Sequence, residues 1–168
     1  KELPPEYYWY DGTTGRYIKG DKMDPGDVTD MNAPHGSMSD PQAKIWPFKV
    51  HRGKQIYDVQ YEHFLVPRTA GKGGFWTEFN WDLAVRLGSK DSGLSYSGQY
   101  DFAETRMFWP TTHMISPKED ALQCIDCHSP NGRLDWVALG YDGDPVKYGG
   151  RPQPDQLSQS ISPEDARP

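Results

Sequence analysis

Apolar positions recur at helical spacing in three short stretches of the chain. The first covers residues 80–88, where Asn80 is suited to cap a helix and Gly88 to end it. The apolar face of this helix consists of Leu83, Ala84 and Leu87. A second short helix is predicted over residues 134–139.

The third predicted helix, over residues 116–128, has the clearest start signal. Ser116 suits the N-cap, Pro117 suits the first helical position, and Glu119 completes a capping box. One side of this helix is lined by Ala121, Leu122 and Ile125. The helix would lead directly into a Cys-x-x-Cys-His sequence at residues 124–128.

Strand-like or irregular spacing is found elsewhere. Residues 45–66 carry several β-branched positions and predict one small β-hairpin that turns at Gly53. Residues 1–45 and 89–102 are rich in turn-forming residues and are predicted to be irregular. The first of these stretches contains the aromatic cluster Tyr7–Tyr10, which we expect to pack on a neighbouring surface.

The composition indicates a core that needs more than aliphatic side chains. Leu, Ile, Val and Phe account for only 28 of the 168 residues, while there are 17 Gly and 15 Pro. The six Trp, ten Tyr and six Phe nevertheless argue against disorder. A large, flat, apolar cofactor would supply the missing burial, and so would a partner surface.

The net charge of -6 argues against nucleic acid or an anionic membrane surface as a partner, because both require basic patches. No apolar run approaches the ~18 residues of a membrane span. No signal peptide is visible at Lys1, so we expect a chain that begins after processing or belongs to something longer.

The strongest chemical signal is Cys124-Ile-Asp-Cys127-His128, the attachment signature of c-type haem. On a helical turn, residues three apart share a face, so both thiols can form thioethers to the haem vinyl groups. His128 then points its imidazole at the iron as the proximal ligand. Its other ring nitrogen is expected to donate to a carbonyl or a carboxylate.

Three alternatives compete with haem attachment at this motif. A redox disulfide would call for a thioredoxin-like βαβ pattern, which the sequence lacks. A zinc site would need two more ligands, and there is no second Cys-x-x-Cys or paired-histidine motif. The third alternative is two inert cysteines followed by a chance histidine.

A sixth iron ligand in a cytochrome c is commonly histidine or methionine. His113 follows Trp109–Thr112 and has apolar neighbours, and His35 precedes Gly36, which would let a flat group approach the backbone. A lone histidine is otherwise more often a surface or core residue. The remaining candidates are His51, His63, Met23, Met31, Met38, Met107 and Met114.

Several long stretches together resemble a known family. They are Pro34-His35-Gly36-Ser37, KIWPFKVHRGKQ (44–55), FWTEFNWDLAVRLG (75–88), YSGQYDFAETRMFWPTTHM (96–114), PKEDALQCIDCHS (117–129) and NGRLDWVALGYDGDP (131–145). They resemble the C-terminal part of octaheme tetrathionate reductase-type cytochromes, relatives of multihaem hydroxylamine oxidoreductases and pentahaem nitrite reductases. The resemblance covers most of residues 5–150.

The resemblance implies that His35 and His113 are axial haem ligands. Because the haems of that family are closely stacked, one of the pair would complete the haem on His128 and the other would serve a haem attached elsewhere. The family carries eight attachment motifs and a lysine-ligated catalytic haem, whereas this chain has one motif and no Cys-x-x-Cys-Lys. This chain alone therefore lacks that family's substrate site.

Together, these observations predict a mainly α, haem-organised domain with much irregular structure, a few short helices and one small β-hairpin. The domain would cover residues 1–150, including an irregular aromatic N-terminal arm, and residues 151–168 would form an extended Pro-rich tail. A four-helix-bundle monohaem cytochrome is disfavoured by the Gly and Pro content.

The expected function is electron transfer through one covalent haem c, with iron held by His128 and by His113 or His35, inside a multihaem assembly. Alternatives are a non-catalytic part of a tetrathionate, nitrite or hydroxylamine reductase, or a module of a haem-chain filament. Expected partners are other multihaem cytochrome chains, copies of itself and redox proteins. Because thioethers form outside the cytoplasm, a periplasmic, extracellular or cell-surface location is expected.

Overall fold

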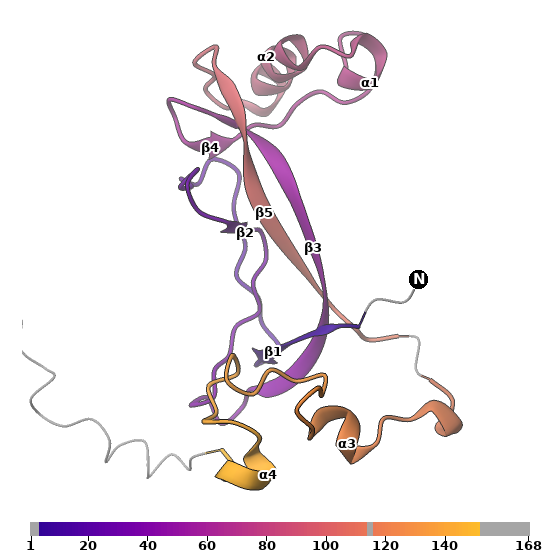
Figure 1. Cartoon of the computed structure of the whole chain (residues 1–168). Helices are drawn as coiled ribbons and strands as arrows, with labels where there is room; N and C mark the ends of the chain where they lie inside the picture. Colours follow the sequence, from indigo (N-terminus) through magenta and orange to yellow (C-terminus); the bar gives the residue numbers. More distant parts are fainter. Residues whose placement is uncertain (1–3, 114–115, 152–168) are drawn as a thin grey trace, which may run out of the picture. The chain divides into compact units, whose positions relative to one another are not determined.

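The computed structural model describes residues 4–113 and 116–151. The chain divides into two compact units that alternate along the sequence (Figure 1). Unit 1 comprises Lys1–Thr14, Pro34–Val50 and Phe108–Pro168, and unit 2 comprises Gly15–Ala33 and His51–Met107. Apart from Arg151, the predicted Pro-rich tail lies outside the described residues, as does Met114.

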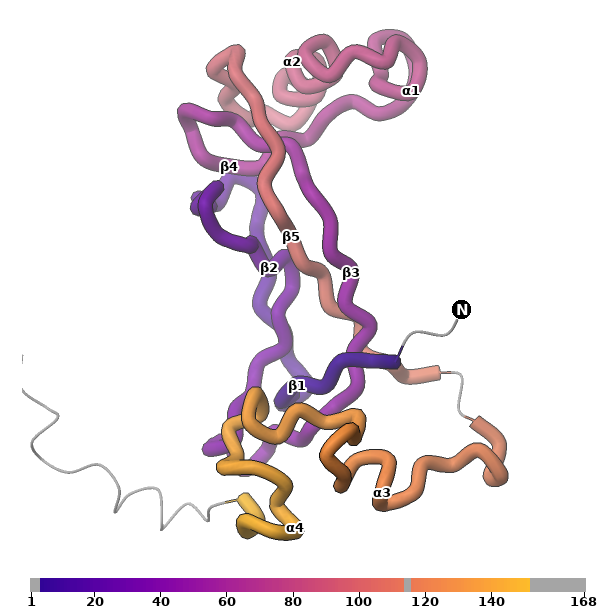
Figure 2. Tube along the Cα trace, in the orientation of Figure 1, coloured from indigo at the N-terminus to yellow at the C-terminus, as the bar shows by residue number. Residues whose placement is uncertain are grey.

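Five strands form a sheet of order β1-β3-β5-β2, with β4 paired to β3 beside this path. The strands are β1 (Glu6–Tyr10), β2 (Thr29–Asp30), β3 (Lys44–Asp58), β4 (His63–Phe64) and β5 (Tyr100–Pro110). Each unit contains part of β3 and part of β5. Both strands can be followed along the trace in Figure 2. The helices are α1 (Phe75–Glu78), α2 (Trp81–Ser92), the 3-10 helix η1 (Lys118–Asp120), α3 (Cys124–Cys127) and α4 (Pro145–Tyr148).

In unit 1, the predicted aromatic cluster forms strand β1 rather than an irregular arm. β1 pairs antiparallel with the start of β3, so that Tyr8 lies opposite Trp46. Tyr8 and Tyr10 contact the ring of Phe48 edge-on, at centroid distances of 6.1 and 5.3 Å, and Phe48 is fully buried. The surface on which the cluster packs is thus the chain's own strand.

Unit 2 is built on two apolar clusters. The first contains Met23, Tyr57, Phe64 and Ala103, and the second contains Ile56, Leu65 and Val85. The second cluster depends on α2, which starts as predicted: the side chain of Asn80 accepts a hydrogen bond from the backbone N–H of Leu83 at 3.0 Å. The helix therefore begins where its capping signal placed it.

The predicted end of α2 at Gly88 is wrong, because the helix continues to Ser92 and ends at Gly93, which has a left-handed φ of 74°. Gly88 has a different role in the fold. A Cβ atom at this position would lie 1.9 Å from the backbone oxygen of Val66. A glycine is needed there because the helix backbone passes directly against the segment that follows β4.

The prediction of a mainly α fold is wrong, since the chain has 18% helical and 25% strand residues. The hairpin turn predicted at Gly53 is also wrong, because Gly53 lies inside β3 and the chain turns between β3 and β4 instead. β3 shows no steady alternation, since residues 51–54 are all exposed. β3 pairs with β5, which lies about fifty residues later in the chain. A pattern of neighbouring residues therefore does not reveal this pairing.

The helix predicted over residues 116–128 is divided in the structure. Only η1 and the single turn α3 are helical, and Ser116 is not the cap of either. The stretch 134–139 forms turns rather than a helix. Along the described residues, no helix has the length and apolar character needed to cross a membrane.

Candidate functional site

The Cys-x-x-Cys-His motif of unit 1 forms a single capped helical turn. Gln123 and Asp126 make a reciprocal capping box at the start of α3, with the Gln123 N–H donating to Asp126 Oδ2 at 2.7 Å. The N–H of His128 closes the turn by donating to Cys124 O at 2.8 Å. Cys124 is exposed, Cys127 is half-buried, and both thiols are free. The turn thus presents two thiols three residues apart, as thioether formation requires.

The imidazole of His128 is oriented by a carboxylate. Its Nδ1 lies 2.8 Å from Asp144 Oδ1, and Asp144 also caps α4 by accepting from the N–H of Val146 at 3.0 Å. The hydrogen bond from His128 lowers the pKa of Asp144, which is therefore ionised and can only accept. The proton of a neutral imidazole is then on Nδ1, and Nε2 keeps the lone pair that a metal needs.

An indole ring fixes the same imidazole from one face. Trp136 stacks on His128 with ring centroids 5.0 Å apart and planes inclined by 16°. The indole Nε1 donates to the carbonyl oxygen of Cys127 at 3.2 Å, so the ring is tied to the end of α3. His128 is therefore held at one edge by Asp144 and on one face by Trp136, both of which belong to the protein itself.

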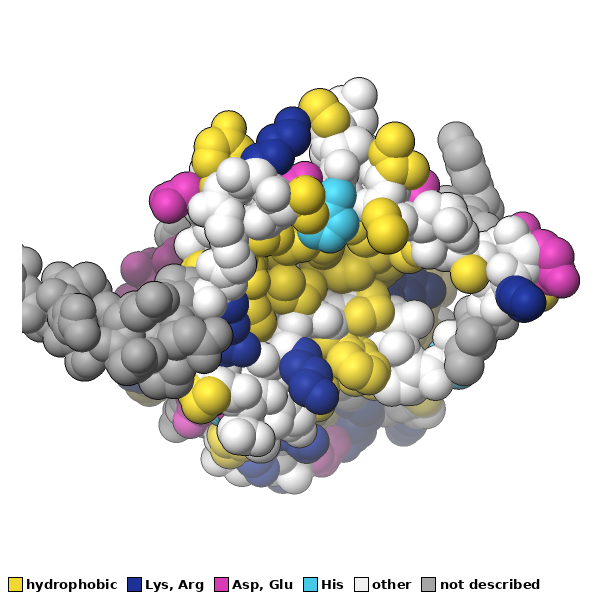
Figure 3. Space-filling model, turned by 90° about the horizontal axis from the view of Figure 1, so that it is seen from below, with side chains coloured by type: hydrophobic (Ala, Val, Ile, Leu, Met, Phe, Trp, Pro, Cys, Tyr) yellow, Lys and Arg dark blue, Asp and Glu magenta, His cyan; other side chains and the backbone are white. Residues whose placement is uncertain are grey.

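Large apolar side chains around the motif remain exposed within unit 1. Ile125, inside the motif, is 69% exposed, and Val146 on α4 is 73% exposed. Others in this unit are Trp109, Leu122, Val137 and Tyr148. Figure 3, seen from below, shows hydrophobic side chains gathered in a hollow with a histidine at its edge. Surfaces of this kind typically receive a ligand or partner.

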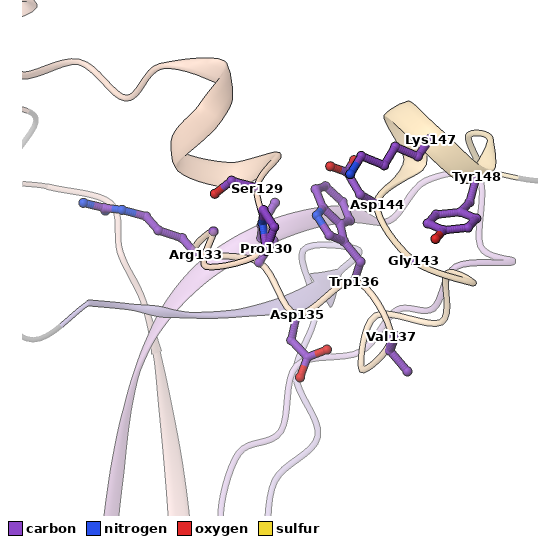
Figure 4. Close-up of a pocket in the computed structure, with 12 residues that line it drawn as sticks. Ser129, Pro130, Arg133, Asp135, Trp136, Val137, Gly143, Asp144, Lys147 and Tyr148 are labelled. Atoms are coloured by element: carbon purple, nitrogen blue, oxygen red, sulfur yellow. The ribbon is translucent and has the colours of Figure 1, made fainter.

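A cavity of about 460 Å³ lies beside the motif, between Ser129–Val137 and Gly143–Tyr148. Figure 4 shows Trp136 and Asp144 close to one another at this cavity, the first from the turns and the second from the start of α4. Lys147 and Tyr148 contribute further walls. Both residues that hold His128 therefore also shape a hollow surface.

The donor set fits a c-type haem better than a zinc ion. The motif offers two free thiols and a histidine whose Nε2 is available. Exposed apolar side chains beside it could pack against the macrocycle. Among the residues that the structure describes, no three or more His, Cys, Asp or Glu side chains come together to hold a metal ion.

The two candidate sixth ligands, His35 and His113, both belong to unit 1 and are exposed. His35 Nδ1 lies 3.0 Å from Thr13 Oγ1, and the backbones of these two residues also hydrogen-bond. Gly36 has a left-handed φ of 134° and packs closely on the chain itself, because a Cβ there would lie 2.9 Å from Ala43 Cβ. This glycine serves the chain's own packing.

The loop that follows His35 is secured by the last described residue. The guanidinium of Arg151 donates to the carbonyl oxygens of Met38 at 2.5 Å and Ala43 at 3.0 Å, and also to those of Ser37 and Asp40. It also lies 4.7 Å from the ring centroid of Trp9. The position of His35 is thus fixed by contacts at both ends of the described chain.

The other histidines belong to unit 2. His63 is buried, stacks on Tyr61 at 6.0 Å, and has Nδ1 3.3 Å from Phe64 O, which are the contacts of a packing residue. His51 is exposed on β3. Sequence reasoning missed Trp136 and Asp144. The Asp144-Pro145 pair signals a helix start, but nothing in the sequence links it to His128.

This chain is similar to known proteins in both sequence and structure. Residues 1–131 match the model of a family described as bacterial cytochrome c. The crystal structure of octaheme cytochrome c from Shewanella oneidensis is similar, with a TM-score of 0.86 and 52% sequence identity, over 91% of this chain and 36% of that one. This chain therefore spans about a third of that protein's length. No curated protein matches.

Proposed function

This chain belongs to the bacterial cytochrome c family, and from that premise we propose that Cys124, Cys127 and His128 hold its haem. The observation that carries the proposal is the arrangement of two free thiols on one helical turn beside an imidazole whose Nδ1 is occupied by Asp144. The family implies a covalently bound c-type haem with iron. One haem per chain is our proposal, because the sequence has one attachment motif.

The function is electron transfer within a multihaem cytochrome. When bound, the haem supplies one-electron chemistry at its iron. The residues of this chain would hold the haem: Cys124 and Cys127 would anchor the macrocycle and His128 would offer Nε2. The exposed Ile125 and its apolar neighbours would be covered by it. Burial and ligation by such residues set the potential at which the electron moves.

Within the family, we place the chain with the C-terminal part of octaheme tetrathionate reductase-type cytochromes. The long stretches around His35, His113 and the attachment motif support this assignment, as does the 52% identity to an octaheme cytochrome. The remaining haems would be attached to polypeptide outside this sequence or to a partner protein. Partners would be other multihaem cytochrome chains or copies of this one, in the periplasm or outside the cell.

Redox spectroscopy of the haem-loaded protein tests this function. The expected result is one covalent haem per chain by intact mass, and a reversible one-electron conversion between ferric and ferrous low-spin spectra. Low-spin, six-coordinate iron has no open position for substrate, so it fits a carrier rather than a catalytic site. A high-spin, five-coordinate spectrum in the reduced protein would argue against the carrier role.

A second candidate function is a non-catalytic part of a multihaem reductase, and the octaheme neighbour is the observation that favours it. In that case the lysine-ligated catalytic haem would lie outside this sequence, which has no Cys-x-x-Cys-Lys motif. Purification with bound partners and counting of haems by mass separates the two. A filament module would appear in the same experiment as copies of this chain alone.

We propose that His113 and His35 are distal ligands, one for the haem on His128 and one for a haem outside this chain. Replacing either by alanine should convert one haem to a high-spin spectrum, or break the assembly that shares it. His51→Ala is the matched control, since His51 is also exposed but belongs to unit 2. Unchanged spectra and unchanged oligomer size in both variants would refute the ligand assignment.

A further inference from the structure

The residues that hold His128 lie downstream of the attachment motif. Asp144 and Trp136 follow residue 131, where the match to the family model ends. Trp136 lies in the turns after the motif, and Asp144 begins α4 (Figure 4). The orientation of the proximal histidine is therefore set by residues that lie up to sixteen positions beyond it in the chain.

The edge contact determines which nitrogen of His128 is free. Asp144 Oδ1 and His128 Nδ1 are 2.8 Å apart, and their side chains are only 15% and 30% exposed. A partly buried hydrogen bond to an ionised acceptor is stronger than one between neutral groups. It also places negative charge beside the imidazole, which raises the donor strength of Nε2.

The face contact restricts rotation of the ring. Trp136 is nearly parallel to His128, with an angle of 16° between the planes. Because its indole N–H is bonded to the carbonyl of Cys127, the indole cannot turn without breaking that hydrogen bond. The two contacts together leave the imidazole one orientation relative to α3.

We propose that Asp144 and Trp136 are positioning residues that clamp His128 with Nε2 toward the iron and hold the haem potential low. The inference rests on the proposed function, since it requires the haem to be ligated by His128. A carboxylate next to the ligand favours ferric over ferrous iron, because the ferric form carries one more positive charge.

Potentiometric titration of the haem-loaded protein at fixed pH tests the clamp. Asp144→Asn keeps a cap for α4 but removes the charge, and it should weaken the ferric preference about tenfold, an upward shift of ~59 mV. Asp144→Ala removes the acceptor as well, so its shift in potential should be larger.

Trp136→Phe keeps a stacking ring but loses the hydrogen bond to the carbonyl of Cys127. It should broaden or split the ligand signals in the NMR spectrum of the ferrous protein while moving the potential less.

Asp142→Asn is the matched control, because Asp142 is exposed in the same segment and His128 is bonded to Asp144 instead. Equal shifts of the haem potential in the Asp142 and Asp144 variants would show that the effect comes from net charge alone, which would overturn the clamp. A wild-type potential in Asp144→Ala, with covalent haem present, would overturn it too. Failure of the proposed function looks different, since the unmutated protein would then carry no covalent haem.

Discussion

Replacing Cys124 and Cys127 together by alanine is expected to abolish covalent haem attachment completely. These are the only two cysteines of the chain, so no other thiol can form a thioether. The haem should be lost on denaturing electrophoresis, and the intact mass should fall to that of the bare polypeptide. The exposed Ile125 and the neighbouring apolar side chains would then have no macrocycle to cover them, and aggregation of the variant should increase.

The single variants sharpen this test. Cys124→Ala and Cys127→Ala each leave one thioether, which should shift the α band of the denatured, pyridine-ligated haem relative to the unmutated protein. Ser129→Ala, one residue beyond the motif, is the control and should leave haem content and spectrum as they were. Covalent haem persisting in the double variant would place attachment outside this motif and contradict the proposed site.

The second large effect is expected at Asp58, a fully buried carboxylate at the end of β3 in unit 2. Its oxygens accept from the backbone N–H groups of Gln60 at 2.9 Å, Tyr61 at 2.8 Å and Ser97 at 2.6 Å. Asp58→Ala leaves three donors without this acceptor in a buried turn. Each hydrogen bond to a charged group contributes about 1.5–3 kcal/mol, so losing all three should lower the free energy of unfolding by about 4.5 kcal/mol or more.

The stabilisation from Asp58 should depend on pH. Burial by itself raises the pKa of this carboxyl, but the hydrogen bonds from Ser97, Tyr61 and Gln60 outweigh it and lower the pKa below its ordinary value. The stabilisation is therefore fully present above the pKa of the unfolded chain, about 3.9, and is lost as pH falls through the lower folded value.

Urea unfolding between pH 7 and pH 3 measures this contribution. The unmutated protein should lose more stability than Asp58→Ala as the pH falls, because the variant has no such carboxylate to protonate. Asp101→Ala removes an exposed carboxylate from the same unit and should change stability little. If both variants follow the pH dependence of the unmutated protein, Asp58 is not the group responsible.

Local signals in the sequence were sufficient for some elements. The Asn80 cap predicted the start of α2 because a cap acts through bonds within four residues. The Cys-x-x-Cys-His motif likewise carries its chemistry in five consecutive residues. Both features depend on neighbours in the chain, which sequence patterns record.

Features that depend on distant neighbours were missed. The long strand β3 pairs with β1 and β5, which lie far from it in sequence, and its run of exposed residues hides the alternation of a half-buried strand. Trp136 and Asp144 were overlooked as partners of His128 for a related reason. Asp144 is sixteen residues from His128, and only the turns between them bring the two side chains together.

The alternation of the two units along the chain has a consequence for the timing of folding. Unit 1 draws on three separated segments, and Trp9 in β1 donates its indole N–H to the carbonyl of Leu139, 130 residues later. Contacts of such separation form slowly, because a long loop must close before they contribute. When the N-terminal end of the chain appears first, all of unit 2 is present before the last segment of unit 1, with which β1 makes its contact. That segment also holds the cysteines, so maturation enzymes would meet them while unit 1 is still open.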